Sequence, residues 1–299
     1  MINKKKIKIF ITGHKGMVGS SLLRFLKKKN FGKILCATRS VLNLENSTKV
    51  HNFIKKHKPD VIVNCAGKVG GILANSTYPT EFLNENILIQ TNLIKSAYKN
   101  NIQHFINLGS SCIYPKYSKQ PIKENYLLSG SLEQTNEAYA IAKIAGIKMC
   151  ESYNIQHGTN FICVMPTNLY GPNDNYDLET SHVLPALLRK MILGKHLQKS
   201  DFEFIKSDLE KRPIQGLDHT ASEHQIIAVL SKYGIRDKGE SVEVEIWGTG
   251  TPLREFLHVD DLADALVHLL KSYSGPSHVN IGTGEEISVK DLAQTISLG

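Results

Sequence analysis

Near its amino end the chain reads Lys8-Ile-Phe-Ile-Thr-Gly-His-Lys-Gly-Met-Val-Gly19. A short β-branched run, Lys8 to Thr12, leads into a turn with glycines at 13, 16 and 19, and the turn opens an amphipathic stretch, Met17 to Lys29. Such glycines permit a tight turn and a close backbone approach to a pyrophosphate, whose charge the helix N-terminus attracts. A glycine-rich turn without a ligand is the alternative, but the strand-to-helix context and the glycine spacing favour a dinucleotide site of a dehydrogenase or reductase.

The rest of the first half alternates between strand-like and helix-like runs. Further strands are expected at Ile34–Thr38, Pro59–Asn64, His104–Leu108 and Phe161–Met165. Further helices are expected at Ser47–His57, Glu81–Asn100 and Glu137–His157. Repeated βα units of this kind predict an α/β fold with a Rossmann-type, doubly wound parallel sheet.

The second half is less regular and predicts a smaller α/β domain. Helices are expected at Val183–Leu193 and Asp260–Lys271, and strands at Val242–Trp247 and His278–Ile281. Residues 195–241 are polar and poorly periodic apart from Glu223–Tyr233, and we interpret them as an insertion that could form a lid or an oligomer contact. We therefore expect a dinucleotide-binding domain over residues 1–166 and a mainly substrate-binding domain over residues 167–299, with a return of late segments to the first sheet left open.

The composition argues against several other kinds of protein. The chain has 299 residues, 41% of them hydrophobic, and no apolar run long enough to span a bilayer. Its five cysteines are odd in number and none lies at metal-ligand spacing, so we expect no disulfide framework and no metal site, and we interpret the protein as cytoplasmic. The net charge of +8 fits a solvated basic surface or an attraction for anionic ligands. Nucleic-acid binding is not expected, because the basic residues are not interleaved with aromatic ones.

The end of the second expected strand indicates which nicotinamide cofactor fits. Enzymes that use NAD usually have an acidic residue there, which holds the ribose hydroxyls. This chain reads Cys36-Ala-Thr-Arg39-Ser40, with an arginine and no acid. Because a guanidinium matches a 2′-phosphate and Lys15 in the glycine turn adds positive charge, NADP is expected rather than NAD. An ordinary surface arginine is the alternative for Arg39.

Three further residues have the spacing that carbonyl reduction requires. Ser110 follows the fourth expected strand, at the end of the sheet where ligands bind, and Tyr139 and Lys143 share one face of the following helix. A lysine ammonium beside a phenol lowers the pKa of the phenol, so Tyr139 could exchange a proton near neutral pH. A lone Tyr-x-x-x-Lys is common on exposed helices, but the three signals together resemble the short-chain dehydrogenase/reductase family.

Longer segments narrow this resemblance. They are Lys68–Asn75, Gly109–Lys116, Asn136–Gly146, Pro166–Pro172, Ser181–Arg189 and Trp247–Asp261. From end to end they resemble the GDP-L-fucose synthase family of extended short-chain reductases. The resemblance implies an oxidoreductase with epimerase activity, which inverts C3 and C5 of GDP-4-keto-6-deoxy-D-mannose and reduces C4 with NADPH.

The resemblance also implies roles for individual residues. Cys112 is implied as the base and His182 as the acid of the epimerisation, whereas Tyr139 protonates the alkoxide that Ser110 helps to stabilise. The implied cofactor-binding residues are Gly13, His14, Lys15, Gly16, Met17, Val18, Gly19, Arg39, Asn43, Leu44, Leu108, Gly109, Lys143, Pro166, Asn168, Leu169 and His182. The implied substrate-binding residues are Lys190, Trp247 and Arg254.

Several alternatives stay open at this stage. Arg189 is an alternative to Lys190, and Trp247 could be a core anchor instead. The rival functions are C4 reduction of another GDP-4-keto sugar such as a heptose, with or without epimerisation, and non-catalytic NADP binding. The family continues past the position of Gly299 with an aspartate near the nucleotide, so we expect part of the substrate domain to lie outside this sequence. A homodimer that pairs the two long helices is implied by the resemblance alone.

Overall fold

The computed structural model describes residues 7–275 and 277–298, and these form two compact units. The first unit contains residues 7–174 and, apart from residue 276, residues 255–285. The second contains residues 175–254 and 286–298. The chain therefore leaves the first unit after Asp174 and re-enters it at Glu255.

Among the described residues, a six-stranded sheet forms the centre of the first unit. Its strands are β1 (Lys8–Thr12), β2 (Lys33–Cys36), β3 (Val61–Asn64), β4 (His104–Leu108), β5 (Asn160–Pro166) and β10 (Val279–Ile281). They lie in the order β10-β5-β4-β3-β1-β2 with parallel pairings, which confirms the predicted doubly wound sheet. β2 ends at Cys36 rather than at Thr38, because the Thr38 carbonyl accepts the N–H groups of Val41 and Leu42 in a turn.

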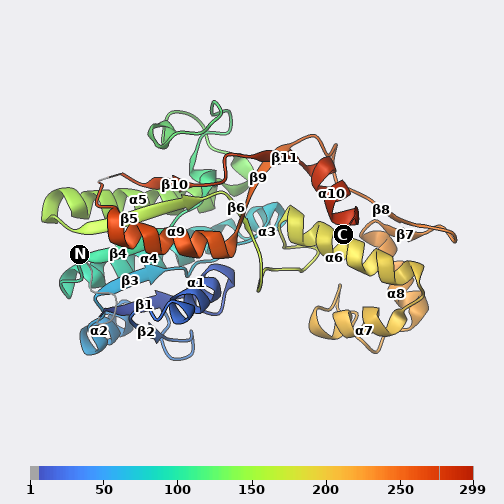
Figure 1. Cartoon of the computed structure of the whole chain (residues 1–299), viewed down its shortest axis with the longest axis horizontal. Coiled ribbons are helices and arrows are strands. Elements are labelled where there is room, and N and C mark those ends of the chain that lie inside the picture. The colour runs from blue at the N-terminus through green and yellow to red at the C-terminus, as the bar shows by residue number, and fades with distance from the viewer. Residues whose placement is uncertain (1–6, 276, 299) are drawn as a thin grey trace. The chain divides into compact units, whose positions relative to one another are not determined.

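Helices cover both faces of this sheet (Figure 1). α1 (Met17–Lys28) and α9 (Val259–Ser272) pack on one face, and α2 (Ser47–His57), α4 (Pro79–Lys99) and α5 (Glu137–His157) pack on the other. The alternation of side chains along β1 explains the two layers. Ile9 and Ile11 belong to the apolar cluster under α1 and α9, whereas Phe10 belongs to the cluster on the opposite face.

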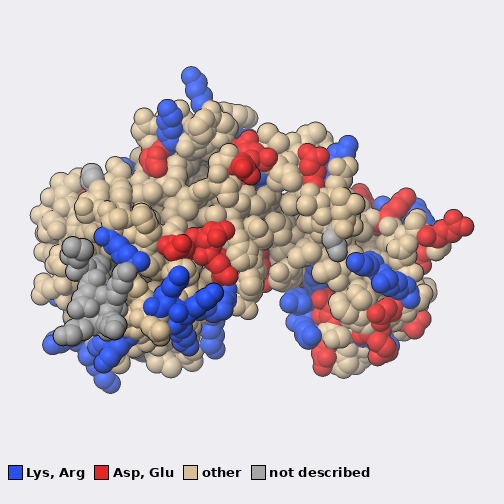
Figure 2. Space-filling model, viewed as in Figure 1, with Lys and Arg blue, Asp and Glu red and all other residues tan. Residues whose placement is uncertain are grey.

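The contact between α1 and α9 joins two distant parts of the sequence. The Ser21 hydroxyl donates to the Val259 carbonyl at 3.2 Å, and Arg24 pairs with Asp260 at 2.8 Å. Figure 2 shows basic and acidic groups next to each other where Figure 1 places these helices. Because both partners of the ion pair are about half exposed, it contributes only about 0–1 kcal/mol, and the apolar packing of Leu22 and Leu266 holds the helices together.

Shorter elements surround the carboxyl edge of the sheet. They are α3 (Ile72–Thr77), the 3-10 turns Ser111–Ile113, Glu124–Tyr126 and Gln134–Asn136, and β6 (Asn168–Tyr170), which pairs in parallel with β9 (Leu253–His258). The three 3-10 turns lie between β4 and α5, so the segment between Ser110 and Glu137 consists of turns and loop rather than a long helix.

The second unit is built around its own apolar cluster. Its elements are α6 (Val183–Gln198), α7 (Phe202–Lys211), α8 (Glu223–Lys232), β7 (Ile235–Asp237), β8 (Val242–Val244), β11 (Glu286–Ser288) and α10 (Val289–Leu298). Leu193 of α6, Leu209 of α7 and Leu230 of α8 are fully buried in one cluster. The segment interpreted as an insertion therefore supplies much of the core of this unit.

No helix is expected from the sequence at the position of α7, and this expectation is wrong. Asp201 caps α7 by accepting the N–H of Phe204 at 3.1 Å, and Ile205 and Leu209 are buried one turn apart. The apolar spacing was therefore present, but the charged residues on the exposed face of this short helix conceal it. The strand expected at Val242–Trp247 is also shorter than predicted, because only Val242–Val244 pairs with β7.

The described residues contain neither a membrane-spanning helix nor a cluster of metal ligands. In this part of the chain no helix combines the length and the apolar character needed to cross a membrane. The same residues contain no group of three or more His, Cys, Asp or Glu side chains arranged to hold a metal ion.

Candidate active site

The glycine turn lies where the order of the strands reverses, between β1 and β3. Gly13 has φ +63°, and a Cβ atom there would lie 2.6 Å from the carbonyl oxygen of Cys65, which follows β3. A Cβ atom on Gly19 would overlap the Gly13 carbonyl. Only glycine is accommodated at these two positions, so the backbone forms a tight cradle at the topological switch point, where ligands bind in sheets of this kind.

The amino end of α1 fits an anionic group in that cradle. Gly16 caps the helix without any side-chain hydrogen bond, and its first turn has no acidic residue. The adjacent Lys15 is exposed. Uncapped N–H groups, the helix dipole and a nearby ammonium are the features that bind a pyrophosphate.

Arg39, the residue predicted to contact a 2′-phosphate, forms ion pairs with two glutamates. The Arg39 side chain is 73% exposed, and its guanidinium lies 2.7 Å from Glu45 and 3.8 Å from Glu85. Asn43 accepts the N–H of Glu45 at 3.0 Å, and the Leu44 carbonyl accepts an amide hydrogen of Asn92 at 2.9 Å, so this loop is held in place. The positive charge of Arg39 suits the 2′-phosphate of NADP, which would bind the guanidinium alongside Glu45.

Ser110 and Cys112 lie together at the carboxyl end of β4. Ser110 caps the 3-10 turn Ser111–Ile113, and its Oγ accepts the backbone N–H of Cys112 at 3.4 Å. Gly109, just before it, donates its N–H to the Val164 carbonyl of β5 at 2.8 Å, and a Cβ atom at Gly109 would overlap the Met165 side chain. The sheet therefore fixes the start of this turn, while Cys112 stands one residue into it.

Tyr139 and Lys143 share one face of α5, as the spacing predicts. The Lys143 ammonium is buried and donates to the Leu108 carbonyl at 2.9 Å, and it lies 5.5 Å from the centre of the Tyr139 ring. Tyr139 is held from the other side by Phe82, whose ring stands edge-on at 5.9 Å. The lysine thus ties α5 to the end of β4 and brings Tyr139 close to Ser110, with which it forms a hydrogen bond.

The electrostatics of this cluster differ from the expectation for Tyr139. Burial raises the pKa of the Tyr139 phenol well above its ordinary value, and the Cys112 charge adds to that rise, against the hydrogen bond from Ser110. The predicted lowering by Lys143 is not found, because the ammonium bonds to a carbonyl and its own pKa is lowered by burial to about 8. A phenol that keeps its proton at neutral pH suits an acid that protonates an alkoxide.

Burial also governs the Cys112 thiol. It raises the pKa of Cys112 to about 11, although the hydrogen bond with Ser110 and the positive charge of Lys143 act in the opposite direction. At neutral pH the thiol is therefore mostly protonated. The base role that the resemblance implies requires ionisation against this shift, and it makes the reaction rate depend on pH.

A network of buried amides connects these elements, although no motif in the sequence predicts it. Thr12 donates to Asn64 at 2.7 Å, Asn64 donates to Asn107 at 2.8 Å, and Asn107 donates to Gln90 at 3.5 Å. Gln90 in turn donates to the Ala142 carbonyl of α5. The only sequence signal is a polar residue inside each apolar strand. Since buried polar groups are costly without partners, this network fixes β1, β3, β4 and α5 relative to one another.

Three further predicted cofactor residues lie at or just after the end of β5. Pro166 ends β5 opposite Ile281 of β10, and Asn168 donates to the Glu255 carbonyl at 2.9 Å. Leu169 packs against the apolar cluster under α1 and α9. These residues hold the backbone that leaves β5 at the same carboxyl edge as Gly13.

In the second unit, Lys190 and Trp247 form a cation–π pair. The Lys190 ammonium lies 3.9 Å from the centre of the indole ring and 3.5 Å from the Glu245 carbonyl. Lys190 is buried and its pKa is lowered to about 8 by burial, whereas Trp247 is 58% exposed. The indole is thus supported by a cation and is open to solvent, so Trp247 is not the core anchor considered as the alternative.

Arg189 has a structural role, because its guanidinium joins parts of the second unit. It is 3% exposed, and its guanidinium binds Asp208 of α7 through two nitrogens at 2.9 and 2.6 Å, as well as the Arg212 carbonyl. The structure therefore favours Lys190 over Arg189 as the available cation. Arg254 is exposed, and its guanidinium donates to the Leu253 carbonyl at 2.7 Å and makes no ion pair within the described residues.

His182 also belongs to the second unit, where it precedes α6. It caps this helix through its backbone and makes no side-chain capping bond, while the surrounding protein lowers the pKa of the imidazole by desolvation. The residue remains exposed, so its ring is accessible for proton exchange.

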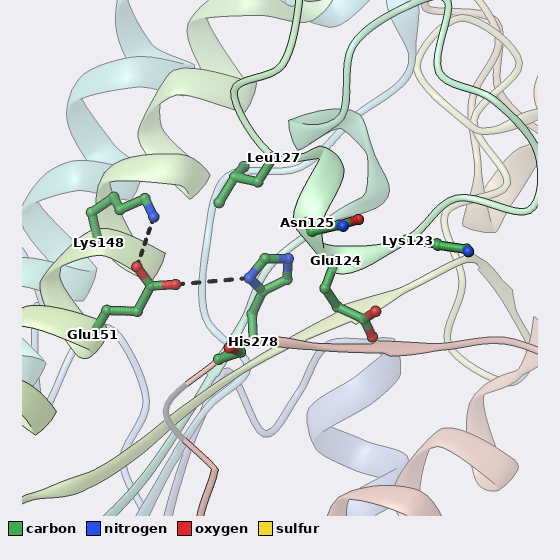
Figure 3. Close-up of a pocket in the computed structure, with 8 residues that line it drawn as sticks. Lys123, Glu124, Asn125, Leu127, Lys148, Glu151 and His278 are labelled. Carbon is green, nitrogen blue, oxygen red and sulfur yellow. Dashed lines mark hydrogen bonds and ion pairs between the residues drawn. The ribbon is translucent and has the colours of Figure 1, made fainter.

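A separate pocket in the first unit contains none of the predicted residues. It has a volume of about 500 Å³ and is lined by Lys123, Glu124, Asn125, Leu127, Lys148, Glu151, Ser277 and His278. In Figure 3, Glu151 lies between Lys148 and the imidazole of His278.

The fold and the Ser110–Tyr139–Lys143 cluster are those of a Rossmann-type reductase of the short-chain dehydrogenase/reductase class. The chain belongs to the NAD-dependent epimerase/dehydratase family, which it matches over residues 9–213 and 216–282.

Individual relatives cover nearly the whole chain. It is 46% identical to GDP-L-fucose synthase 1 of Arabidopsis thaliana over 99% of this chain and 78% of the relative. It is 42% identical to the GDP-L-fucose synthase of Escherichia coli over 98% of this chain and 81% of the relative. The solved structure of a GDP-mannoheptose C4 reductase from Campylobacter jejuni with NADP bound superimposes with a TM-score of 0.85 at 39% identity, covering 99% of this chain and 86% of that one.

Proposed function

We propose that this protein converts GDP-4-keto-6-deoxy-D-mannose to GDP-L-fucose, by epimerisation at C3 and C5 followed by reduction at C4 with NADPH. The observation that carries the proposal is the position of Cys112, whose N–H donates to Ser110 within the reductase cluster. A plain reductase needs only Ser110, Tyr139 and Lys143. The likeness to two GDP-L-fucose synthases over nearly the whole chain supports the same assignment.

The cofactor proposed is NADP(H), held by the cradle around Gly13, the amino end of α1 and the cations Lys15 and Arg39. When bound, NADPH supplies a hydride to C4 of the sugar. Ser110 hydrogen-bonds the C4 oxygen, and Tyr139 gives its proton to the alkoxide as charge develops there. Lys143 keeps Tyr139 in position for this step, because its bond to the Leu108 carbonyl at 2.9 Å joins α5 to the end of β4.

Epimerisation uses the acidity that the C4 ketone gives to its neighbouring carbons. Cys112 removes a proton from C3 or C5, which leaves an enolate whose oxygen Ser110 and Tyr139 stabilise. His182 returns a proton from the opposite face, so that the centre is inverted. Proton removal and return balance, and no redox change occurs until C4 is reduced.

The nucleotide part of the substrate is assigned to the second unit. Lys190 and Arg254 supply positive charge for the diphosphate, and the open face of Trp247 suits a flat base or the bridge between sugar and nucleotide. The cation–π pair with Lys190 orients the indole before any ligand arrives. This division assigns NADP to the first unit and the GDP-sugar mainly to the second.

A homodimer that pairs α4 and α5 of two copies is part of the proposal. Both helices expose large apolar side chains, namely Leu88 and Tyr98 on α4 and Ile141 and Ile155 on α5. Ile155 is 83% exposed, which is unusual for isoleucine unless a partner covers it. Light scattering should give twice the chain mass, and Ile155→Glu should shift the distribution toward the single chain.

We also propose a cytoplasmic location without nucleic-acid or membrane partners. All five cysteines are free thiols, which is typical of a reducing compartment.

The second candidate is C4 reduction of a GDP-4-keto-heptose, favoured by the likeness to the Campylobacter jejuni heptose C4 reductase. The presence of both Cys112 and His182 argues for the full epimerising reaction instead. Non-catalytic NADP binding is disfavoured because Tyr139 and Lys143 are both present.

One experiment separates these candidates. The protein is given NADPH and fresh GDP-4-keto-6-deoxy-D-mannose in heavy water, and carbon-bound deuterium in the product is counted by mass spectrometry after the hydroxyls are washed with ordinary water. Reduced product with deuterium at both C3 and C5 is expected, because the hydride itself is unlabelled. Reduced product without deuterium would make the protein a plain C4 reductase. No reduction of this sugar, but reduction of the heptose analogue, would support the second candidate.

A further inference from the structure

A hydrogen-bond chain joins β10 to the turn that carries Cys112. Tyr114 ends that turn and is 5% exposed, and its hydroxyl lies 3.0 Å from Nε2 of His278 and also bonds to Oδ1 of Asn280. His278 and Asn280 are 164 and 166 residues from Tyr114 in the sequence. Only the folded sheet brings these three side chains together.

The direction of each hydrogen bond follows from the partners. The Asn280 amide donates from Nδ2 to the Ile122 carbonyl at 3.2 Å, so its Oδ1 accepts the single proton of the Tyr114 hydroxyl. The Tyr114 oxygen is then an acceptor toward His278, and the imidazole carries its proton on Nε2. Burial lowers the pKa of His278, which keeps the ring in this neutral form.

On its other side, the His278 ring is hydrogen-bonded to none of the described residues. It is 6% exposed and lines the pocket shown in Figure 3, where its Nδ1 faces a Glu151 oxygen at 3.9 Å. Glu151 is bound by Lys148 at 2.7 Å on the same helix, α5. Nδ1 has no hydrogen-bond partner among the described residues, so the bond to Tyr114 is the one directional contact that His278 makes there.

The positions of Ser110, Tyr139 and Lys143 do not depend on the hydrogen bonds among Tyr114, His278 and Asn280. Ser110 lies just after β4, and the preceding residue, Gly109, is hydrogen-bonded to β5. Lys143 is hydrogen-bonded to the end of β4. Cys112, in contrast, lies in a single 3-10 turn. The backbone bonds from Ile113 to Ser110 and from Tyr114 to Ser111 lie within the turn itself, and the packing of Ile113 is not directional. The hydroxyl of Tyr114 therefore supplies the directional tether between this turn and β10.

We propose that Tyr114 and His278 are positioning residues that aim the Cys112 thiol for epimerisation, while the reduction at C4 is left to separately supported residues. This inference rests on the proposed function, because it gives Cys112 a proton to remove. It assigns a role in one of the two reactions to residues that touch neither the substrate nor the cofactor. Asn280 completes the tether by fixing the proton of Tyr114.

The test compares Tyr114→Phe with Tyr126→Phe. Tyr126 lies in the same loop, and its hydroxyl makes no hydrogen bond among the described residues, so it is a matched control. Exchange of C3 and C5 protons is measured in heavy water without NADPH, and reduction is measured as NADPH oxidation. Tyr114→Phe should slow exchange by roughly tenfold to a hundredfold, as expected for a misplaced catalytic group, while reduction changes by less than about threefold. Part of the reduced product should then lack deuterium.

A second pair of variants tests His278. His278→Gln keeps a side-chain N–H donor for Tyr114, and His278→Leu removes it. Exchange in His278→Gln should stay within about threefold of the unaltered protein, whereas His278→Leu should fall between His278→Gln and Tyr114→Phe, because the bond from Tyr114 to Asn280 remains. Exchange and reduction falling together, or neither changing in Tyr114→Phe, would overturn the inference and leave a purely structural role.

A readout that does not require turnover separates this inference from the proposed function. Alkylation of Cys112 by iodoacetamide, followed peptide by peptide, should become several-fold faster in Tyr114→Phe, because a released turn exposes the thiol. If the unaltered protein exchanges no protons but alkylation still responds, the proposed epimerisation fails while the tether stands. An unchanged alkylation rate would contradict the tether itself.

Discussion

The residues assigned to reduction and those assigned to epimerisation are supported in different ways. Ser110 follows a central strand, and Tyr139 and Lys143 stand on a helix of 21 residues that is bonded to the same strand. Cys112 lies in a 3-10 turn of three residues, and His182 lies just before a helix. One set is thus fixed by the centre of the sheet, while the other depends on local contacts at the ends of elements.

This difference indicates where each reaction can be lost. A change in the buried amides or in α5 affects the whole first unit, since those groups hold strands and helix together. A change near Cys112 needs to move only one turn. Epimerisation should therefore be lost more easily than reduction, and substitutions in one set of residues should affect mainly one activity.

The largest effect is expected from Tyr139→Phe. Loss of the proton donor should lower the rate of NADPH oxidation by roughly a thousandfold, whereas C3 and C5 exchange should fall by about tenfold or less. Tyr153→Phe, on the same helix, is the control. Equal losses of reduction and exchange would show that the residues assigned to the two reactions do not act separately.

Cys112→Ala is expected to lower proton exchange and to leave reduction largely intact. Deuterium exchange should fall by about a hundredfold or more, while NADPH oxidation continues and yields an unepimerised 6-deoxy sugar. Cys36→Ala, a partly buried thiol on β2, serves as the control. A variant that still incorporates deuterium at both carbons would show that another group is the base.

The dependence on pH should also separate the two activities. Because the pKa of Cys112 is raised to about 11, the thiolate fraction should increase about tenfold for each pH unit between roughly pH 6.5 and 8.5, and in His182→Asn, where solvent returns the proton, the exchange rate should increase with it. Tyr139 keeps its proton throughout this range, so reduction should vary far less. In the unaltered protein the imidazolium fraction of His182, whose pKa is lowered, falls as the thiolate fraction rises, so exchange should be nearly flat; a flat profile in His182→Asn as well would show that Cys112 is not the base.

The smallest effect concerns the second unit. Trp247 is the only tryptophan in the sequence, so its fluorescence reports directly on nucleotide binding. Lys190→Met should weaken GDP binding by roughly fivefold, through loss of one charge and of the cation–π pair. Lys195→Met, an exposed position on the same helix, should leave the titration unchanged. If GDP does not alter the emission of the unaltered protein, Trp247 is not part of the nucleotide site.

The sequence was sufficient to predict the parts of the fold that rest on local patterns. The alternation in β1, the glycines at 13 and 19 and the Tyr139–Lys143 spacing are all readable within a few residues. The engagement of Arg39 by Glu45 and Glu85, the burial that raises the pKa of Cys112 and the contact of Tyr114 with His278 arise only when distant segments meet. α7 is an exception, because Asp201 and the buried pair Ile205 and Leu209 gave a local signal that its charged face concealed.

The bond between Ser21 and Val259 spans 238 positions and also has a consequence for biosynthesis. The chain is made from its amino end, so β1 and α1 leave the ribosome long before α9 and β10 exist. At about 5–20 residues per second, α1 waits roughly 10 to 50 s for its partner helix. During that interval one apolar face of the nascent sheet, including Ile9 and Ile11, has no cover from α9, and the edge of β5 has no neighbour. A chaperone acting on this protein during translation would therefore have the first unit, and not the later second unit, as its main client.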